Sequence, residues 1–502
     1  MRRAISIAAL LTAACTSAPA PAPAPVVPAP APEAAPQAAP APQIDTVPPV
    51  LGPAPSVTLP PIDRRTLPNG MTLLVVEQHE LPLADFVLVL GSGTEADPAT
   101  RGGLASLTGA LLREGTTTRS ALQIADQLSF LGASLNSGSG WDLSQVSLHT
   151  STAQMDSALA LFADVVLHPA FATKDVDRLK QQRLTDLLQS RDRPRDIADR
   201  VYAAALYGSA HPYGHPATGT EQSTKAITGA DVRRFYQTYY RPNNATLIVV
   251  GDVTPADVER RARALFGGWK RGSVPETKYP TATAAAPKPT IYLVDKPGAP
   301  QSSIRIGEVG VARSTPDYFA LMVMNTILGG SFSSRLNQNL REKRGFTYGA
   351  GSGFAMRRQP GPFVARAEVT GTKTDSSLIE FMSELRGIRD TVSSAELGRA
   401  KRYLELQLPG DFETTGSIAS QLVPVVVYGL PPDFYSSYVQ QIEKVTQADV
   451  QRVAQRYLDP SKMAIVVVGD RASIEAGIRA LNLGEVTLRD VNGAAIAGAA
   501  RP

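Results

Sequence analysis

The chain contains very little cysteine and little histidine. Its 502 residues include one cysteine and five histidines, so no disulfide can form within the chain. Stability therefore has to come from packing rather than from covalent cross-links. No internal apolar run reaches the roughly 20 residues that a membrane-spanning helix needs, so the sequence predicts a globular body.

An excess of charge of one sign is also missing. Lysine and arginine number 50 against 46 acidic residues, which leaves a net charge of +4. Nucleic-acid-binding proteins usually carry a basic patch with interleaved aromatic residues, and this chain has no such cluster. The sequence therefore predicts no nucleic-acid partner. The length predicts two to four domains, and a hydrophobic fraction of 43% is enough for ordinary cores.

Residues 1–15 have the pattern of a bacterial export signal. Two arginines precede a short apolar core, Ala4–Ala14, which is too short to span a bilayer and ends in small residues. The only cysteine follows in Leu-Thr-Ala-Ala-Cys, which resembles a lipoprotein processing site with Cys15 as the lipidated residue. Thr12 stands where leucine is commoner in such sites, and simple signal cleavage is the alternative. By analogy with Gram-negative lipoproteins, the lack of an aspartate after Cys15 favours the outer membrane.

Residues 16–61 are rich in alanine and proline. Repeated Pro-Ala pairs cannot build a core and favour extended polyproline conformations. We expect a tether that holds a folded body away from a membrane, with acyl chains on Cys15 as the anchor. These features together predict a lipid-anchored protein of the periplasm.

An internal repeat organises the rest of the chain. Residues 227–252 read ITGADVRRFYQTYYRPNNATLIVVGD, and residues 445–470 read VTQADVQRVAQRYLDPSKMAIVVVGD. The Ala-Asp-Val, a tyrosine, a proline and the Val-Val-Gly-Asp recur at a constant offset of 218 positions (445 minus 227). Repeats of this kind are the sequence signature of a duplicated unit. The body is therefore predicted to be two homologous domains.

The predicted domains are residues 62–271 and 290–483, joined by a Pro/Ala/Thr-rich linker at 272–289 and followed by a loose tail at 484–502. Strands followed by clustered helices predict an α+β fold, in which each domain is a mostly antiparallel sheet with helices on one face. The expected strands include Met71–Val76, Phe86–Leu90 and Leu143–His149, and the expected helices include Gly102–Glu114, Met155–Leu167, Val176–Ser190, Asp317–Leu328, Asp375–Arg389 and Ser394–Leu406.

One segment in the second domain, residues 328–354, is the main functional candidate. Glycines open it, a polar helical run carries Arg341, and a turn at Gly345 leads to Tyr348 on a glycine-rich strand. A cation and a phenol delivered from a helix end and the next strand can converge on one oxygen of a bound peptide. On this segment alone, a solvated arginine and a half-buried tyrosine are the more ordinary interpretation.

Several motifs in order over residues 59–483 resemble the M16 family of zinc peptidases, the group of pitrilysin and the mitochondrial processing peptidase. The resemblance implies two domains of the LuxS/MPP-like metallohydrolase type. The motifs are LPNGMTL at 67–73, GSGTE at 91–95, the helix at 102–116, HPY at 211–213 and the run from Leu340 to Tyr348.

Active members carry His-x-x-Glu-His on the first of these helices, with the histidines as zinc ligands and the glutamate as general base. Here residues 103–116 read GLASLTGALLREGT. The residues that flank the motif match the family pattern, but the zinc ligands and the general base are absent. Ser106, Gly109 and Ala110 stand where His, Glu and His belong, and Asp186 aligns with the glutamate that is the third ligand. Because a catalytic zinc takes about three protein ligands, the resemblance implies no metal in this chain and no base to activate water.

Other catalytic or metal sites are not indicated. His211 and His215 have the spacing of a helical ligand pair, but the prolines and the glycine around them disfavour a helix. Ser106 has no basic partner nearby in the sequence, which favours a packed polar residue over a nucleophile. No nucleophile elbow, phosphate loop or dinucleotide fingerprint is present.

The second domain keeps what the family's second domains contribute. Arg341 and Tyr348 match an Arg/Tyr pair, in which the tyrosine would donate to the oxyanion of the scissile peptide and the arginine would fix the substrate backbone. The resemblance thus implies catalytic roles for these two residues beside a partner's zinc. Glycines and serines just before them would admit a substrate strand: Gly329, Gly330, Ser331 and Ser333.

The leading hypothesis is a non-catalytic, substrate-binding subunit of a heterodimeric periplasmic M16 zinc peptidase. A partner chain would supply zinc and the general base, and unfolded peptides would bind by adding a strand to a sheet edge. The alternative is a peptide-binding or scaffold lipoprotein with no part in hydrolysis. Hydrolysis by this chain alone would require replacements for all four missing site positions.

Overall fold

The computed structural model describes residues 60–280 and 289–496. The predicted export signal, Cys15 and nearly all of the Ala/Pro-rich segment lie outside these residues. The predicted linker is described as far as residue 280, and the predicted tail as far as residue 496. None of the helices in the described part of the chain is both long enough and apolar enough to cross a membrane.

The first half is built on a six-stranded sheet with the order β1-β2-β6-β3-β5-β4. β2 and β6 pair in parallel, and the other neighbours pair antiparallel. β4 is therefore an edge strand with one free side. The strands are β1 (Asp63–Thr66), β2 (Thr72–Glu77), β3 (Leu83–Leu90), β4 (Ser134–Ser139), β5 (Ser144–Ser151) and β6 (Ala245–Gly251).

The second half repeats this arrangement with the order β12-β7-β11-β8-β10-β9. β7 pairs in parallel with β11 and with β12, and the other pairs are antiparallel. The strands are β7 (Thr290–Asp295), β8 (Gln301–Val309), β9 (Thr347–Phe354), β10 (Pro362–Thr370), β11 (Ala464–Gly469) and β12 (Glu485–Arg489). The prediction of a loose tail after Leu483 is wrong for β12, because its backbone hydrogen bonds complete the edge beside β7.

Helices of each half cover one face of that half's sheet. On β2, Leu73 and Val75 point into the core with α1, α3, α7 and α8, as the period of two in a strand requires. The first-half helices are α1 (Leu104–Leu111), α2 (Ala121–Leu131), α3 (Met155–Leu167), α4 (Thr173–Ser190), α5 (Pro194–Tyr207), α6 (Glu221–Ala226), α7 (Gly229–Tyr239) and α8 (Pro255–Phe266). The second-half helices are α9 (Tyr318–Asn325), α10 (Arg335–Asn337), α11 (Thr374–Asp390), α12 (Ser394–Gln407), α13 (Thr415–Tyr428), α14 (Tyr438–Lys444), α15 (Gln447–Tyr457) and α16 (Arg471–Ala480).

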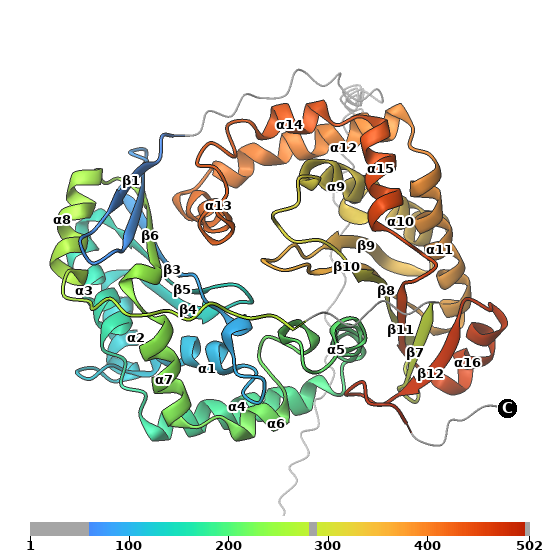
Figure 1. Cartoon of the computed structure of the whole chain (residues 1–502), viewed down its shortest axis with the longest axis horizontal. Helices are drawn as coiled ribbons and strands as arrows, with labels where there is room; N and C mark the ends of the chain where they lie inside the picture. The colour runs from blue at the N-terminus through green and yellow to red at the C-terminus, as the bar shows by residue number, and fades with distance from the viewer. Residues whose placement is uncertain (1–59, 281–288, 497–502) are drawn as a thin grey trace, which may run out of the picture. The chain divides into compact units, whose positions relative to one another are not determined.

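The other face of each sheet is covered by a helix from the opposite half. α13 packs on β3 and β6, where its apolar side chains meet Leu74 and Val76 of the first sheet. α5 packs in the same way on β8 and β11 of the second sheet. Figure 1 shows α13 beside the first sheet and α5 beside the second. This exchange ties the two halves together through apolar contacts, which are the main stabilising term in folding.

The α+β prediction is confirmed, with two homologous halves and mixed sheets. The helix expected at 155–167 is observed with the same bounds. The helix expected at 102–114 is α1 followed by a 3₁₀ turn, Leu112–Glu114. The helix expected at 317–328 continues past α9 as a π-helical segment, Thr326–Gly330. Such π segments are rare and frequent at functional sites, and periodicity does not distinguish them from an α-helix.

Candidate functional site

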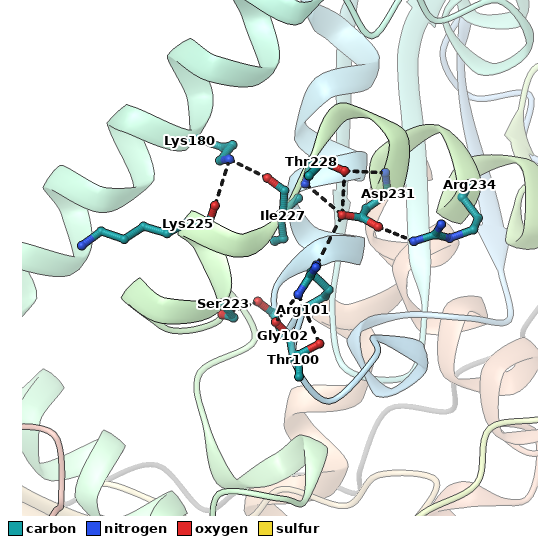
Figure 2. Close-up of polar contacts among 10 residues, drawn as sticks. All are labelled: Thr100, Arg101, Gly102, Lys180, Ser223, Lys225, Ile227, Thr228, Asp231 and Arg234. Carbon is teal, nitrogen blue, oxygen red and sulfur yellow. Dashed lines mark hydrogen bonds and ion pairs between the residues drawn. The ribbon is translucent and has the colours of Figure 1, made fainter.

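The start of α1 is held by contacts from α6 and α7, and α4 in turn contacts the residues between those two helices. Arg101 Nε donates to Asp231 Oδ2 at 3.3 Å, and Ser223 Oγ donates to the Gly102 carbonyl at 2.7 Å. Asp231 also closes the capping box of α7 with Thr228, and Lys180 of α4 donates to the Ile227 carbonyl at 2.5 Å. Figure 2 shows these contacts meeting between α1, α4, α6 and α7. The helix that carries the zinc motif in active relatives is therefore fixed in place here.

The first turn of α1 depends on a glycine and on a buried carboxylate. Gly103 has φ of 89°, and a Cβ atom there would lie 2.3 Å from the Thr218 carbonyl oxygen. Asp97 accepts from the backbone N–H of Gly103 at 2.6 Å and of Ala105 at 2.8 Å, which satisfies free donors at the helix start. Burial raises the pKa of Asp97 to about 7, against the helix N–H groups and Arg183, which lower it.

Arg183 of α4 reaches the position where an active relative would present its first zinc ligand. Its Nη1 donates to the Gly103 carbonyl at 2.7 Å, and its Nη2 donates to Ser106 Oγ at 3.1 Å. Burial lowers the pKa of Arg183 to about 10, so the guanidinium still carries its charge at neutral pH, and Asp97 and Asp186 favour that charge. Ser106 Oγ thus accepts a hydrogen bond from a guanidinium, and no general base is bonded to it among the described residues. This setting agrees with a packed polar residue rather than a nucleophile.

The remaining positions of the zinc motif are closed or point elsewhere. A Cβ atom at Gly109 would lie 2.9 Å from the Gly138 carbonyl carbon, because β4 runs directly against α1 there. Ala110 is half-buried and offers only a methyl group. Asp186 is exposed, and its Oδ1 accepts from Gln182 Nε2 at 2.9 Å. The four positions therefore do not form a set of metal ligands.

A zinc ion does not fit this arrangement. One exposed carboxylate and one serine bonded to a guanidinium fall short of three ligands, and the charge of Arg183 opposes a divalent cation. His211 and His215 flank a 3₁₀ turn, Pro212–Gly214, rather than sharing a helix face, as the sequence predicts. His211 Nδ1 instead accepts from the Tyr213 N–H at 3.0 Å. Residues 60–280 and 289–496 contain no group of three His, Cys, Asp or Glu residues arranged to hold a metal.

The Arg/Tyr element of the second half is exposed and assembled. Arg341 lies in a second π-helical segment, Gln338–Lys343, and Tyr348 lies near the start of β9. The Arg341 guanidinium carbon is 5.2 Å from the Tyr348 ring centre and 4.8 Å from that of Phe332. The Tyr348 side chain is 90% exposed and that of Phe332 62% exposed. The cation therefore lies against two aromatic faces on an open surface.

The turn between the two residues explains why they meet. Gly345 takes φ of 65°, and its N–H donates to the Arg341 carbonyl at 3.0 Å. Thr347 Oγ1 donates to the Glu368 carbonyl of β10 at 2.6 Å and so aligns the start of β9. β9 is an edge strand that pairs only with β10. The Tyr348 hydroxyl has no hydrogen-bond partner in the part of the chain that the structure describes.

The glycines and serines before this element lie in two different settings. A Cβ atom at Gly329 would lie 2.3 Å from the Ser352 nitrogen, so this glycine allows the π segment to pack on β9. Gly330 is similarly close to Asn325. Ser331 and Ser333 line a polar cavity of about 380 Å³ that Arg341 and Tyr348 do not line. The substrate-binding role of the four residues stays a prediction.

Comparison with known proteins agrees with this organisation. The family model described as "Insulinase (Peptidase family M16)" matches residues 73–219, and the model "Peptidase M16 inactive domain" matches residues 226–404. A solved peptidase M16 inactive domain from Pseudomonas fluorescens is 30% identical with a TM-score of 0.76, over 81% of this chain and 98% of that one. The chain belongs to the M16 peptidase family.

Other relatives extend the M16 comparison. An uncharacterized zinc protease of Mycobacterium leprae is 29% identical over 82% of this chain and 92% of that protein. A protease structure from Helicobacter pylori, 21% identical over 82% of this chain and 100% of that chain, has a TM-score of 0.76 and shows the same fold. Each of these two proteins matches more than four-fifths of this chain, so each comparison includes both halves of the folded body.

Two residues of the site were not found by sequence reasoning. Arg183 lies in an amphipathic helix with several other cations, and nothing in its spacing marks the one that turns inward. Phe332 stands between two serines in a glycine-rich segment, and a large exposed aromatic residue there was the available signal.

Proposed function

We propose that this chain is the non-catalytic, substrate-binding subunit of a heterodimeric M16 zinc peptidase. A partner chain with an intact His-x-x-Glu-His motif supplies zinc and the general base. This chain supplies Arg341 and Tyr348 to the composite site. The observation that carries the proposal is the contrast between a motif helix without ligands and an exposed Arg/Tyr pair whose phenol has no partner within the described residues.

The geometry of the pair suits a role toward a second chain. Contacts with two aromatic rings hold the Arg341 guanidinium in one orientation before a substrate binds. Such cation–π contacts contribute about 0.5–1 kcal/mol at exposed sites. An exposed phenol on an edge strand can reach a carbonyl oxygen that another surface presents. In the M16 mechanism that resemblance implies, Tyr348 donates to the oxyanion of the scissile peptide and Arg341 holds the adjacent backbone.

Peptide recognition follows from the sheet edges. β9 is an edge strand whose Ala350 N–H donates to Asn337 Oδ1 and whose Ser352 carbonyl accepts from Asn325 Nδ2. An extended peptide can add beside Tyr348 as a further strand by replacing these side-chain bonds. Main-chain hydrogen bonds of this kind bind many sequences, which suits unfolded peptide substrates. Gly329, Gly330, Ser331 and Ser333 lie within the segment that leads to this edge and complete the proposed substrate surface.

Reconstitution tests the proposal. This chain and a zinc-bearing M16 homologue encoded by the same genome are purified separately and together, and cleavage of an unstructured peptide is measured. We expect no turnover from this chain alone and turnover from the pair well above that of the homologue alone. If the homologue is equally active without this chain, the scaffold alternative is favoured; if this chain cleaves the peptide by itself, the proposal is wrong.

The site of action is proposed from the amino-terminal residues. The resemblance of residues 11–15 to a lipoprotein processing site and the Pro-rich segment after it support a periplasmic protein held at the Gram-negative outer membrane. Fractionation of cells that express the wild type or Cys15→Ser tests this. The variant should leave the membrane fraction, and unchanged membrane association would refute lipid anchoring through this residue.

A further inference from the structure

A second cavity lies beside the position of the missing zinc ligands and is not lined by the Arg/Tyr pair. It has a volume of about 590 Å³ and is lined by Arg183 and Asp186 of α4, by α5, and by Arg357, Pro362 and Val364 of the second half. A volume of this size accommodates a small ligand or the end of a peptide. A cavity is therefore present beside Asp186, one of the positions at which active relatives carry a zinc ligand.

Three arginines that line the cavity have no carboxylate bonded to them within the described residues. Arg183 donates to the Gly103 carbonyl and to Ser106. Arg200 donates to the Val491 carbonyl at 2.8 Å and to Ser190 Oγ at 2.5 Å. Arg357 makes no side-chain hydrogen bond, and its buried Nη1 is unsatisfied. An unpaired buried guanidinium is costly, and a bound anion removes that cost.

The acidic groups at the cavity are engaged elsewhere. Asp196 pairs with Arg193 at 2.5 Å, and Asp199 pairs with Arg305 at 2.6 Å. Asp186 accepts from Gln182 at the exposed side of α4. Asp142, which also acts on Arg357 electrostatically, accepts from the hydroxyls of Tyr213 and Tyr428 and from the Arg358 N–H. Because Asp186 and Asp142 accept only from neutral donors, three arginines without a bonded carboxylate face two acidic side chains, and the balance at the cavity is positive by one charge. Burial lowers the pKa of Arg357.

The cavity wall is aromatic. The Arg357 guanidinium carbon lies 4.2 Å from the Trp141 ring centre and 4.4 Å from that of Tyr213. The Tyr207 hydroxyl donates to the Pro360 carbonyl at 2.9 Å, and that of Tyr213 donates to Asp142 at 3.0 Å. Because these hydroxyls already have partners, the rings offer apolar surface to a ligand. A cation backed by apolar walls suits an anion with an apolar body.

We propose that the cavity binds a carboxylate carried on an apolar body, with the carboxylate on Arg357 and Arg183 and the apolar group against Trp141 and the tyrosines. Where active M16 relatives hold a divalent cation for a peptide carbonyl, this chain holds fixed guanidinium groups for a full negative charge. The free carboxyl end of a peptide and a free aryl carboxylic acid share this chemistry. The site is separate from the proposed role of Arg341 and Tyr348 and needs neither a partner nor zinc.

Trp141 gives a direct readout of binding. The chain has two tryptophans, and Trp269→Phe leaves Trp141 as the only one. In this background, the isolated chain is titrated with acetyl-Gly-Ala-Phe as the free acid, with the same peptide as its terminal amide, and with 3-phenylpropanoate. We expect the acid to bind at least about tenfold more tightly than the amide, the scale of one charge-assisted hydrogen bond. Binding of 3-phenylpropanoate as tight as that of the acid identifies free aryl acids as the ligand source, and weaker binding identifies peptide ends.

Arg357→Gln should abolish the difference between acid and amide, whereas Arg195→Gln, an exposed arginine on α5 outside the cavity, should leave it unchanged. Equal affinity for acid and amide in the Trp269→Phe chain, or no binding of either at millimolar concentration, would overturn the proposal. This comparison does not use Arg357→Gln, so it stands even if that variant fails to fold. Salt should weaken binding of the acid and leave binding of the amide unchanged.

Discussion

Around α1, polar side chains satisfy one another, whereas the Tyr348 hydroxyl on β9 is exposed and has no partner among the described residues. Arg183, Ser106 and Asp97 form bonds within the first half, and β4 closes on Gly109. In the second half, the Arg341 guanidinium lies against the Tyr348 ring, and Tyr348 is exposed. The duplicated fold thus carries one helix whose polar groups are bonded within the chain and one exposed pair whose phenol has no partner among the described residues.

This contrast shows that the packing surface of a helix and the residues of a site can differ independently in the two halves. The packing surface of α1 is retained because Leu104, Leu107 and Leu111 belong to the core. Ser106, Gly109 and Ala110 are not part of that core, so the apolar packing of α1 does not come from the side chains that stand there. The Arg/Tyr pair is exposed and contributes little to packing, so its presence calls for a functional explanation.

The largest effect is expected at Tyr348. Tyr348→Phe should lower kcat of the reconstituted pair by a factor of about 10²–10³, the scale of losing one oxyanion donor. The melting temperature of the chain should not change, because the hydroxyl has no partner among the described residues. Tyr403→Phe, an exposed tyrosine on α12, is the matched control. Unchanged turnover in the Tyr348 variant would remove the proposed role of the second site.

A smaller effect is expected at Arg341. Arg341→Ala removes the cation between the Phe332 and Tyr348 rings and should lower kcat/KM of the pair about three- to tenfold. Arg341→Lys keeps the positive charge but not the planar stacking. Its kcat/KM should lie between those of the wild type and Arg341→Ala. Arg386→Ala on α11, an exposed arginine, controls for the loss of one positive charge. If Arg386→Ala is as harmful as Arg341→Ala, the position of the cation is unimportant.

The smallest effect is expected from restoring the missing motif. A variant with Ser106→His, Gly109→Glu, Ala110→His and Asp186→Glu should retain no zinc after dialysis. Two features cause this: Arg183 occupies the ligand region with a positive charge, and a side chain at position 109 meets the backbone of β4. Adding Arg183→Ala relieves only the first. Stoichiometric zinc in the fourfold variant would show that the first site lacks only its ligands, and that Arg183 and the β4 backbone do not prevent zinc binding.

The repeat at an offset of 218 positions predicted both halves, and helical spacing predicted α3 and α12 within a residue or two. These features are local, so they can be read from neighbouring residues. β12 was missed because its partner, β7, lies nearly 200 residues earlier in the chain. The exchange of α5 and α13 was missed for the same reason: amphipathic pattern shows that a helix has a buried face but not which sheet it covers.

The candidate sites divide in the same way. Motif order predicted that Arg341 and Tyr348 would meet, and their separation in the structure agrees. Phe332 also contacts the Arg341 guanidinium, but it lies outside the motif and so was not predicted to be part of the site. Arg183 was not predicted because the pairing of α4 with α1 is a tertiary contact, and one inward-facing arginine leaves no mark on the period of its helix.

Metal content tests the central claim most directly. This chain alone, the zinc-bearing partner alone and the reconstituted pair are dialysed after zinc loading and analysed for bound metal together with peptide cleavage. The division of labour predicts one zinc per pair, all of it accounted for by the partner, and none retained by this chain. Tightly held zinc in the isolated chain would contradict it.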